Sequence, residues 1–157
     1  MIKVGDTLPE VTFSLRKDGI SSNPKTEDVF AGKKVVIFAV PGAFTPTCSE
    51  AHLPGYVTLF DKFTAKGIDS IVCLSVNDAF VMSAWGDAHN AEHLIMLADG
   101  GAEFTQAIGL GKETGSFGGV RSQRYAMLVE DSVVKVLNIE APGKFEVSDA
   151  ETMLAAV

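Results

Sequence analysis

The sequence predicts an α/β fold, in which a mixed central sheet is flanked by helices. Apolar segments of strand length, such as "KKVVIFAV" (33–40) and "GIDSIVCLSV" (67–76), alternate with segments whose apolar residues recur every three or four positions. Two further strand-like segments follow each other late in the chain with only a short turn between them. Alternation of strands and helices favours parallel strands, and the late pair adds antiparallel ones.

Composition narrows the class of protein. The 157 residues suit one domain, 1–157, with 46% apolar and 21% charged residues. A net charge of -7 disfavours nucleic acid or an anionic membrane as the main partner. No apolar segment approaches the ~20 residues that span a bilayer, and the first residues do not resemble a signal peptide. We expect a soluble, cytoplasmic protein.

The first third of the chain begins with the strand "EVTFSLR" (10–16), and "KDGI" (17–20) is a turn signal that closes a hairpin. Thr26 is expected to cap a short helical turn that ends at Gly32. The segment 33–40 is β-branched and apolar almost throughout, as in a central strand that is covered on both faces.

A helix is predicted from Thr47 to Gly67, because apolar residues recur at helical spacing between them. Pro54 lies inside this segment. Proline has no backbone N–H to donate, so we expect a kink there.

The rest of the chain continues the alternation of strands and helices. Asp78 is expected to cap one helix, and Ser148 or Asp149 the last one. Asp131 is predicted at the turn of the late hairpin, and the Gly-rich segment 111–123 is interpreted as a long surface loop. The expected elements are strand 67–76, helix 78–90, strand 93–99, helix 102–109, strands 124–130 and 132–140, and helix 148–156.

Cys48 stands out among the candidate functional residues. It follows a buried strand and falls in the first turn of a helix, where free backbone N–H groups and the helix dipole favour thiolate over thiol. Ligand crevices of α/β sheets also form at the carboxyl ends of strands. By position alone, Cys48 could equally be a small buried side chain, as most free cysteines are.

The residues around Cys48 carry a family resemblance. "PGAFTPTCSEAHLPGY" (41–56) contains the pattern Pro-x-x-x-Thr-x-x-Cys, and "SVNDAFVMSAWG" (75–86) and "RSQRYAMLVED" (121–131) follow in order. Together they resemble the peroxiredoxins, specifically the atypical type II or Prx5-like branch, over essentially the whole chain. The resemblance implies a thioredoxin-like fold and reduction of hydrogen peroxide and organic hydroperoxides.

The resemblance also assigns roles to residues. Cys48 matches the peroxidatic cysteine, Thr45 the threonine that hydrogen-bonds peroxide and thiolate, and Pro41 the proline that shields the sulfur from water. Arg124 matches the family arginine; it is preferred over Arg121 because it opens the apolar strand. A guanidinium suits an ion pair with the sulfur and stabilises the charge that grows on the departing oxygen. Taken singly, the threonine could be a turn former, the proline a strand terminator and the arginine a surface ion-pair residue.

A sulfenic acid on Cys48 must be reduced by a second thiol. Many relatives carry a resolving cysteine near the segment that here reads "GKFEVSDAET" (143–152), but this segment has none. Cys73 is the only other cysteine, and it lies inside a strand, so we favour a core position over a resolving role. An external thiol is therefore expected, with glutathione and glutaredoxin favoured over thioredoxin.

Other chemistries find less support. His52 lies four residues after Cys48 and invites a Cys/His hydrolase reading, but no third orienting group can be named, so packing or hydrogen bonding is favoured. A thioredoxin-type reductase needs Cys-x-x-Cys, which is missing. A redox-sensing or binding module without fast peroxide turnover stays open as the alternative. No metal or cofactor is expected.

The resemblance further implies a homodimer. Phe44, Phe80 and Phe117 fall in segments that form loops near the active site in the family, and aromatic side chains are common interface anchors. Each of them could equally belong to the core.

Overall fold

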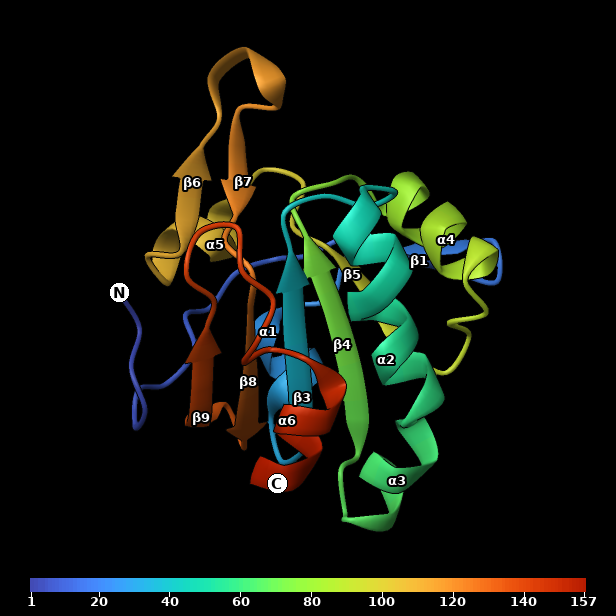
Figure 1. Ribbon diagram of the computed structural model, residues 1–157, viewed down its shortest axis with the longest axis vertical. Coiled ribbons are helices and arrows are strands. Elements are labelled where there is room, and N and C mark those ends of the chain that lie inside the picture. The colour runs from blue at the N-terminus through green and yellow to red at the C-terminus, as the bar shows by residue number, and fades with distance from the viewer.

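A computed structural model describes the chain from residue 1 to residue 157, and its centre is a five-stranded sheet (Figure 1). In spatial order the strands are β5 (Ile95–Ala98), β4 (Ser70–Ser75), β3 (Lys34–Val40), β8 (Tyr125–Glu130) and β9 (Val133–Ile139). β3, β4 and β5 run parallel, whereas β8 is antiparallel to β3 and β9 is antiparallel to β8. The predicted mixed sheet is confirmed.

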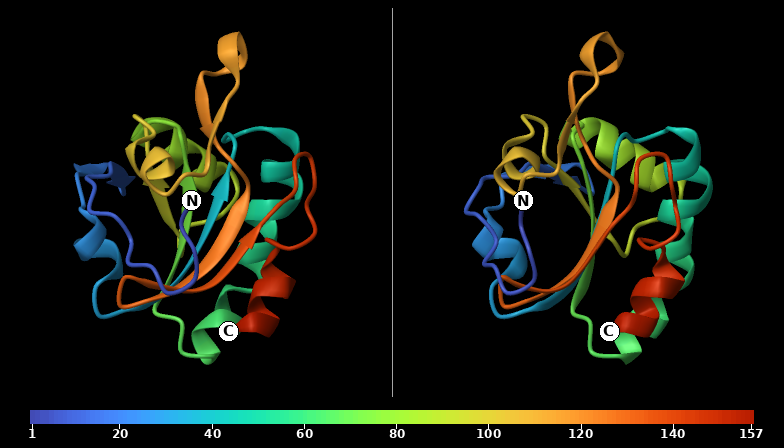
Figure 2. Two further views of the ribbon diagram at one scale, coloured as in Figure 1. Left: turned by 90° about the vertical axis from the view of Figure 1, so that its left-hand side faces the viewer. Right: turned by 60° about the vertical axis from the view of Figure 1, so that its left-hand side comes forward.

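Helices cover both faces of this sheet (Figure 2). Along β3, side chains point alternately to the two faces, because successive residues of a strand face opposite ways. The helices are α1 (Thr26–Phe30), α2 (Leu53–Thr58), α3 (Phe60–Ala65), α4 (Ala79–Ala88), α5 (Glu103–Ala107) and α6 (Ala150–Ala156). Val36 and Phe38 pack in an apolar cluster with α2, α3, α4 and α6, whereas Val35 and Ile37 pack in a second cluster with α1 and α5.

The N-terminal prediction was only partly right. The hairpin exists, as β1 (Leu15–Lys17) paired with β2 (Ile20–Ser22), but the residues before Leu15 form no continuous strand. Instead Ser14 exchanges two backbone hydrogen bonds with Ala98 at the edge of β5. The prediction of Thr26 as a cap was wrong: Lys25 is the N-cap of α1, and the Thr26 hydroxyl donates to the carbonyl of Pro9.

The helix predicted from Thr47 to Gly67 is divided. A π-helical turn, η1 (Cys48–His52), comes first, and α2 and α3 follow it with a break at Leu59. Pro54 stands just after the π turn. Because it cannot donate a hydrogen bond to the turn before it, the backbone widens there, and the Leu53 N–H reaches the Cys48 carbonyl five residues back. The irregularity therefore precedes the proline instead of kinking a regular helix at it.

The segment 111–123 was expected to be a loop and is a hairpin. β6 (Gly111–Glu113) pairs with β7 (Val120–Ser122), and a short 3₁₀ turn, η2 (Gly115–Phe117), lies at the tip. The Gly-rich composition hid the strands but serves the turn, since Gly115 and Gly119 have the positive φ that glycine tolerates best. The hairpin projects beyond the rest of the molecule (Figure 1).

The other local predictions agree with the structure. Asp78 accepts a hydrogen bond from the Val81 N–H and caps α4, and of the two candidates for α6 it is Asp149 that caps. Asp131 and Ser132, both with positive φ, form the turn between β8 and β9. No helix combines the length and the apolar character needed to cross a membrane.

Candidate active site

Cys48 lies just beyond the carboxyl end of β3, at the start of the η1 turn. The helical conformation begins at Pro46, and proline is favoured at a first helical position because its φ is already fixed near the helical value. The Ser49 N–H then donates to the carbonyl of Thr45 over 2.9 Å. The cysteine side chain is completely buried and belongs to the same apolar cluster as Phe38 and Leu53. Its sulfur is nevertheless not enclosed by hydrocarbon alone, because a guanidinium contacts it.

That guanidinium belongs to Arg124. Its Nη2 donates to the Cys48 Sγ over 3.0 Å, and its Nη1 lies 2.8 Å from the Nδ1 of His52. The sheet explains the meeting of residues 76 positions apart. β8 is antiparallel to β3 with Tyr125 opposite Ala39, so Arg124 lies where β3 ends and the cysteine loop begins.

His52 contacts the second terminal nitrogen of the Arg124 guanidinium. It is fully buried, and its Nε2 lies 3.0 Å from the carbonyl oxygen of Ser148, a pure acceptor, so Nε2 carries the proton and Nδ1 accepts from Arg124. Burial first, and the neighbouring Arg124 charge second, lower the pKa of His52 from 6.5 to about 3. The histidine is therefore neutral near pH 7, and it positions the arginine as a hydrogen-bond acceptor.

The segment 140–148 supports this arrangement from the far end of β9. The carboxylate of Glu140 accepts hydrogen bonds from the backbone N–H groups of Glu146, Val147 and Ser148 and from the Ser148 hydroxyl. Burial by itself would raise the pKa of Glu140, but these hydrogen bonds outweigh it and leave the pKa below its usual 4.5. The fixed Ser148 carbonyl then accepts from both His52 and the Tyr56 hydroxyl.

The two remaining residues of the predicted site lie in the loop after β3. The Thr45 hydroxyl donates to the Gly42 carbonyl over 2.7 Å, and it makes no hydrogen bond to the Cys48 sulfur. Its oxygen keeps lone pairs with which it can accept a hydrogen bond. Pro41 is half-buried directly after β3, between the strand and the turn that carries the cysteine.

Arg121 and Cys73 lie apart from the hydrogen bonds around the Cys48 sulfur. The Arg121 Nη1 donates to the Val76 carbonyl, and its guanidinium packs so closely over Gly118 that a Cβ there would collide with it. Of the two arginines, Arg124 is the one whose guanidinium contacts the Cys48 sulfur. Cys73 is a fully buried free thiol in β4, and burial, with a smaller contribution from Cys48, raises its pKa well above 9.0.

Known proteins have a similar sequence and a similar fold. The Redoxin family matches residues 3–154. Peroxiredoxin-2E, chloroplastic, of Arabidopsis thaliana is 50% identical over 165 residues, which cover 99% of this chain and 69% of the relative. The crystal structure of reduced Prx3 from Vibrio vulnificus in complex with hydrogen peroxide is 60% identical, with 99% of both chains covered and a TM-score of 0.97.

The chain belongs to the peroxiredoxin family. A third similar protein, peroxiredoxin 5 from Alvinella pompejana, is 39% identical over 99% of this chain and 97% of that one, with a TM-score of 0.86. This peroxiredoxin therefore has the thioredoxin-like fold that its motifs implied, and it is a peroxidase of the oxidoreductase class.

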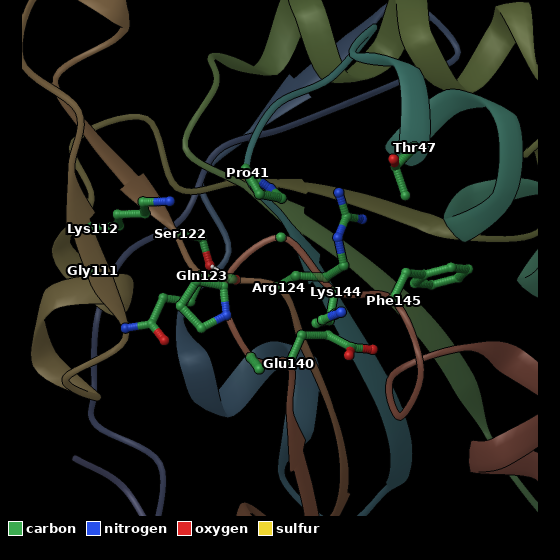
Figure 3. A pocket seen from close by; sticks show the side chains of 13 residues that line it. Pro41, Thr47, Gly111, Lys112, Ser122, Gln123, Arg124, Glu140, Lys144 and Phe145 are labelled. Atoms are coloured by element: carbon green, nitrogen blue, oxygen red, sulfur yellow. Dashed lines mark hydrogen bonds between the residues drawn. The ribbon is translucent and has the colours of Figure 1, made fainter.

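A pocket of about 450 Å³ opens beside the site of this peroxiredoxin (Figure 3). Arg124 lines it and contacts the Cys48 sulfur, while Thr47, the residue before the cysteine, lines it from another side. The lining comes from four parts of the chain: Pro41 and Thr47, Gly111 and Lys112, residues 122–124, and residues 140–145.

Sequence reasoning missed the supporting residues of the site. Tyr56 looked like an apolar position of a helix, and nothing in the sequence around Glu140 or Ser148 points to Cys48, which lies far earlier in the chain. Phe145, whose ring lies 5.8 Å from the Arg124 guanidinium carbon, was missed for the same reason. The weak signal for His52, its spacing of four from Cys48, did place both side chains on the Arg124 side of the turn.

Proposed function

We propose that Cys48 is the nucleophile of this peroxidase and that it passes through a sulfenic acid. The observation that carries the proposal is the contact of 3.0 Å between the Cys48 sulfur and Arg124 Nη2. A cationic donor at that distance stabilises a sulfur anion and is in place for an oxygen that becomes anionic beside it.

The reaction balances with one thiolate and one hydroperoxide. The sulfur attacks the terminal peroxide oxygen, a sulfur–oxygen bond forms, and the oxygen–oxygen bond breaks with its electron pair leaving on the distal oxygen. The alkoxide or hydroxide then takes up a proton, which gives an alcohol or water and leaves Cys48 as a sulfenic acid. Sulfur is oxidised by two electrons and the peroxide is reduced by two.

Thr45 and Pro41 are assigned supporting roles in this step. The hydroxyl hydrogen of Thr45 is engaged by the Gly42 carbonyl, so its oxygen is oriented as an acceptor for the O–H of a hydroperoxide. Pro41 offers no backbone N–H and covers the approach to the sulfur with an apolar ring. Both residues would orient the substrate and exclude water while Arg124 supplies the charge.

An external thiol is proposed to reduce the sulfenic acid. The segment 140–157 contains no cysteine, and Cys73 is fully buried within a central strand, so pairing with Cys48 would require the strand region to open. Glutathione, alone or with glutaredoxin, is the favoured reductant, and thioredoxin is the second candidate.

Peroxide consumption with dithiothreitol tests the proposal. Cys48→Ser should abolish turnover, and Cys73→Ser should largely retain it. Mass spectrometry after one equivalent of peroxide should find a sulfenic acid, or a glutathione adduct when glutathione is present. An intramolecular disulfide would argue against the external reductant, and turnover by the Cys48→Ser variant would argue against the nucleophile.

A further inference from the structure

The pocket beside Arg124 is unusually basic for this molecule. Three cationic side chains line it from three segments: Lys112 of β6, Arg124 before β8, and Lys144 of the segment 140–148 (Figure 3). Its one acidic lining residue, Glu140, already accepts hydrogen bonds from four donors of residues 146–148. The chain as a whole carries a net charge of -7, so the pocket reverses the prevailing sign.

The two lysines have no partner within the protein. The only ion pair within 4.0 Å joins Lys3 and Asp6, and neither Lys112 nor Lys144 donates a side-chain hydrogen bond. A cationic group beside a concave, partly enclosed surface attracts anionic ligands and raises their local concentration. The two unpaired lysine side chains of the pocket are thus suited to bind a ligand that carries negative charges.

We propose that this pocket binds the carboxylates of a small thiol of the glutathione type, the thiol that reduces oxidised Cys48. The inference rests on the proposed function, since it assigns the partner of the same cysteine. Lys112 and Lys144 each pair with a carboxylate, and the thiol is thereby held on the side of the pocket that Arg124 and Thr47 form, next to the cysteine.

Size and chemistry favour a thiol as the occupant. Hydrogen peroxide is far smaller than a pocket of about 450 Å³, whereas a tripeptide fills a space of this order. The pocket is also lined by residues 140–145, and the segment 140–157 contains no cysteine that could reduce Cys48 from within the chain. A docked thiol would thus supply from outside what this chain lacks there.

The proposed step balances as a thiol condensation. The bound thiolate attacks the sulfur of the sulfenic acid, a sulfur–sulfur bond forms, the sulfur–oxygen bond breaks, and hydroxide leaves and is protonated to water. A second thiol then attacks the mixed disulfide, which releases the Cys48 thiolate and an oxidised thiol dimer.

A charge-matched comparison tests the pocket. Protein oxidised with one equivalent of hydrogen peroxide is mixed with glutathione or with glutathione diethyl ester, which keeps the thiol but removes both carboxylate charges. The double variant Lys112→Gln/Lys144→Gln should react with glutathione about tenfold more slowly than the wild type, as expected for the loss of two partly exposed ion pairs, and with the ester at nearly the wild-type rate. Lys62→Gln/Lys135→Gln makes the same charge change at two other exposed lysines and should match the wild type with both thiols.

The outcomes separate the possibilities. The proposed binding of carboxylates is wrong if the double variant reacts more slowly with glutathione and with its ester by the same factor. It is also wrong if the control variant loses as much of its rate with glutathione. If the double variant instead loses oxidation by a fatty-acid hydroperoxide but not by its methyl ester, and keeps its reaction with glutathione, the pocket serves an anionic peroxide and the thiol is excluded.

A binding measurement keeps the test independent of turnover. Calorimetric titration of the reduced protein with S-methylglutathione, which cannot react with a sulfenic acid, should show binding that weakens about tenfold in Lys112→Gln/Lys144→Gln. Absence of binding to the wild type overturns the inference even if peroxide oxidises Cys48. If S-methylglutathione binds with the expected loss of affinity in the double variant, but Cys48 never forms a sulfenic acid, the ligand site is supported and the proposed function is contradicted.

Discussion

Arg124 divides its guanidinium between a sulfur and a neutral ring. One terminal nitrogen contacts Cys48 and the other contacts His52, and no carboxylate lies within ion-pairing distance of either. A carboxylate partner would offset much of the positive charge, whereas a neutral imidazole fixes the direction of the fork and leaves the charge available. In the proposed reaction, the sulfur and the departing oxygen would therefore meet an oriented cation that has no carboxylate partner.

Two substitutions of Arg124 should separate the contribution of its positive charge to the oxidation rate of Cys48 from that of its forked hydrogen-bonding geometry. We expect Arg124→Gln to slow the oxidation of Cys48 by hydrogen peroxide by a factor on the order of 100 or more, as for the loss of one oriented donor at a developing anion. Arg124→Lys keeps the charge but cannot bridge sulfur and imidazole, so its rate should fall between those of the wild type and Arg124→Gln. Stopped-flow kinetics measures the three rates. Arg121→Gln is the matched control, and an equal loss there would contradict the assignment.

His52 should make stability depend on pH in a defined direction. Its folded pKa is about 3 against 6.5, mainly through burial, so unfolding takes up a proton between those values. The free energy of unfolding that this residue contributes is fully present above about pH 6.5 and declines as pH falls, by at most about 1.4 kcal/mol per pH unit.

The variant His52→Gln isolates that contribution, because glutamine does not titrate and can still donate to the Ser148 carbonyl. Urea unfolding between about pH 7 and pH 4 should show the stability advantage of the wild type shrinking steadily toward the acid side. The carboxylates that titrate in the same range are common to both proteins. A constant difference across the range would show that His52 is not held neutral.

At the scale of elements, two short segments meet at Arg124 and make the site with it. The η1 turn places Cys48 and His52 on one side of a helix, and the segment 140–148, anchored by Glu140, places the Ser148 carbonyl where His52 and Tyr56 reach it. The order of contacts is thus Glu140, Ser148, His52, Arg124 and Cys48. A substitution of Glu140 should therefore alter the position of Arg124 at the Cys48 sulfur, because four successive hydrogen bonds connect the carboxylate to the sulfur.

Glu140→Gln tests this chain of contacts. An amide offers one oxygen to donors that now share a carboxylate, and its own N–H₂ faces other N–H groups, so we expect a loss of about 2 kcal/mol or more in the free energy of unfolding. Oxidation of Cys48 should also slow, because Arg124 loses its fixed support. Glu146→Gln, at an exposed position in the same segment, should change neither quantity. An unchanged oxidation rate in Glu140→Gln would separate this segment from the site.

The η1 turn should open when a thiol is attached to Cys48. The sulfur is completely buried, so an adduct the size of glutathione cannot form on the closed turn. Opening would break the hydrogen bond of 3.0 Å from the Trp85 indole N–H to the Ser49 hydroxyl. Because Trp85 is the only tryptophan, its fluorescence should shift to longer wavelength as water reaches it.

The same opening should speed amide hydrogen exchange in residues 46–53 of the adduct. Cys73→Ser should show both changes and Cys48→Ser neither. Adduct formation with unaltered fluorescence and exchange would mean that the turn admits the thiol without unwinding.

For the whole molecule, the sequence predicted what local patterns encode. The β-branched segment at β3 is recognisable as a buried strand from its own residues, and the motif around Cys48 is complete within a few positions. The central strand and the position of the cysteine could therefore be predicted. The partners of His52 could not, because Ser148 lies 96 positions away and meets it only through the tertiary fold. The β6–β7 hairpin was missed because its strands are only three residues long and the segment that joins them is rich in glycine, a composition that favours a loop.

Three phenylalanines expose most of their side chains at the surface of the molecule. Phe44, Phe80 and Phe117 are 55%, 66% and 81% exposed, and their segments all lie at the end of the molecule toward which β3 and β4 run (Figure 1). Exposed aromatic side chains gathered at one end are typical of an interface, and a homodimer would remove them from water.

A charge placed in that patch should therefore shift the protein toward monomer. We expect sedimentation velocity to give a dimer for the wild type and mainly monomer for Phe80→Glu, because a carboxylate buried between two copies would lack a partner. Val4→Glu introduces the same charge at another exposed apolar position, 57% exposed in the N-terminal segment, and should remain dimeric. If both variants and the wild type sediment as monomers at all concentrations, the three phenylalanines serve some purpose other than self-association, and the active site is complete in a single chain.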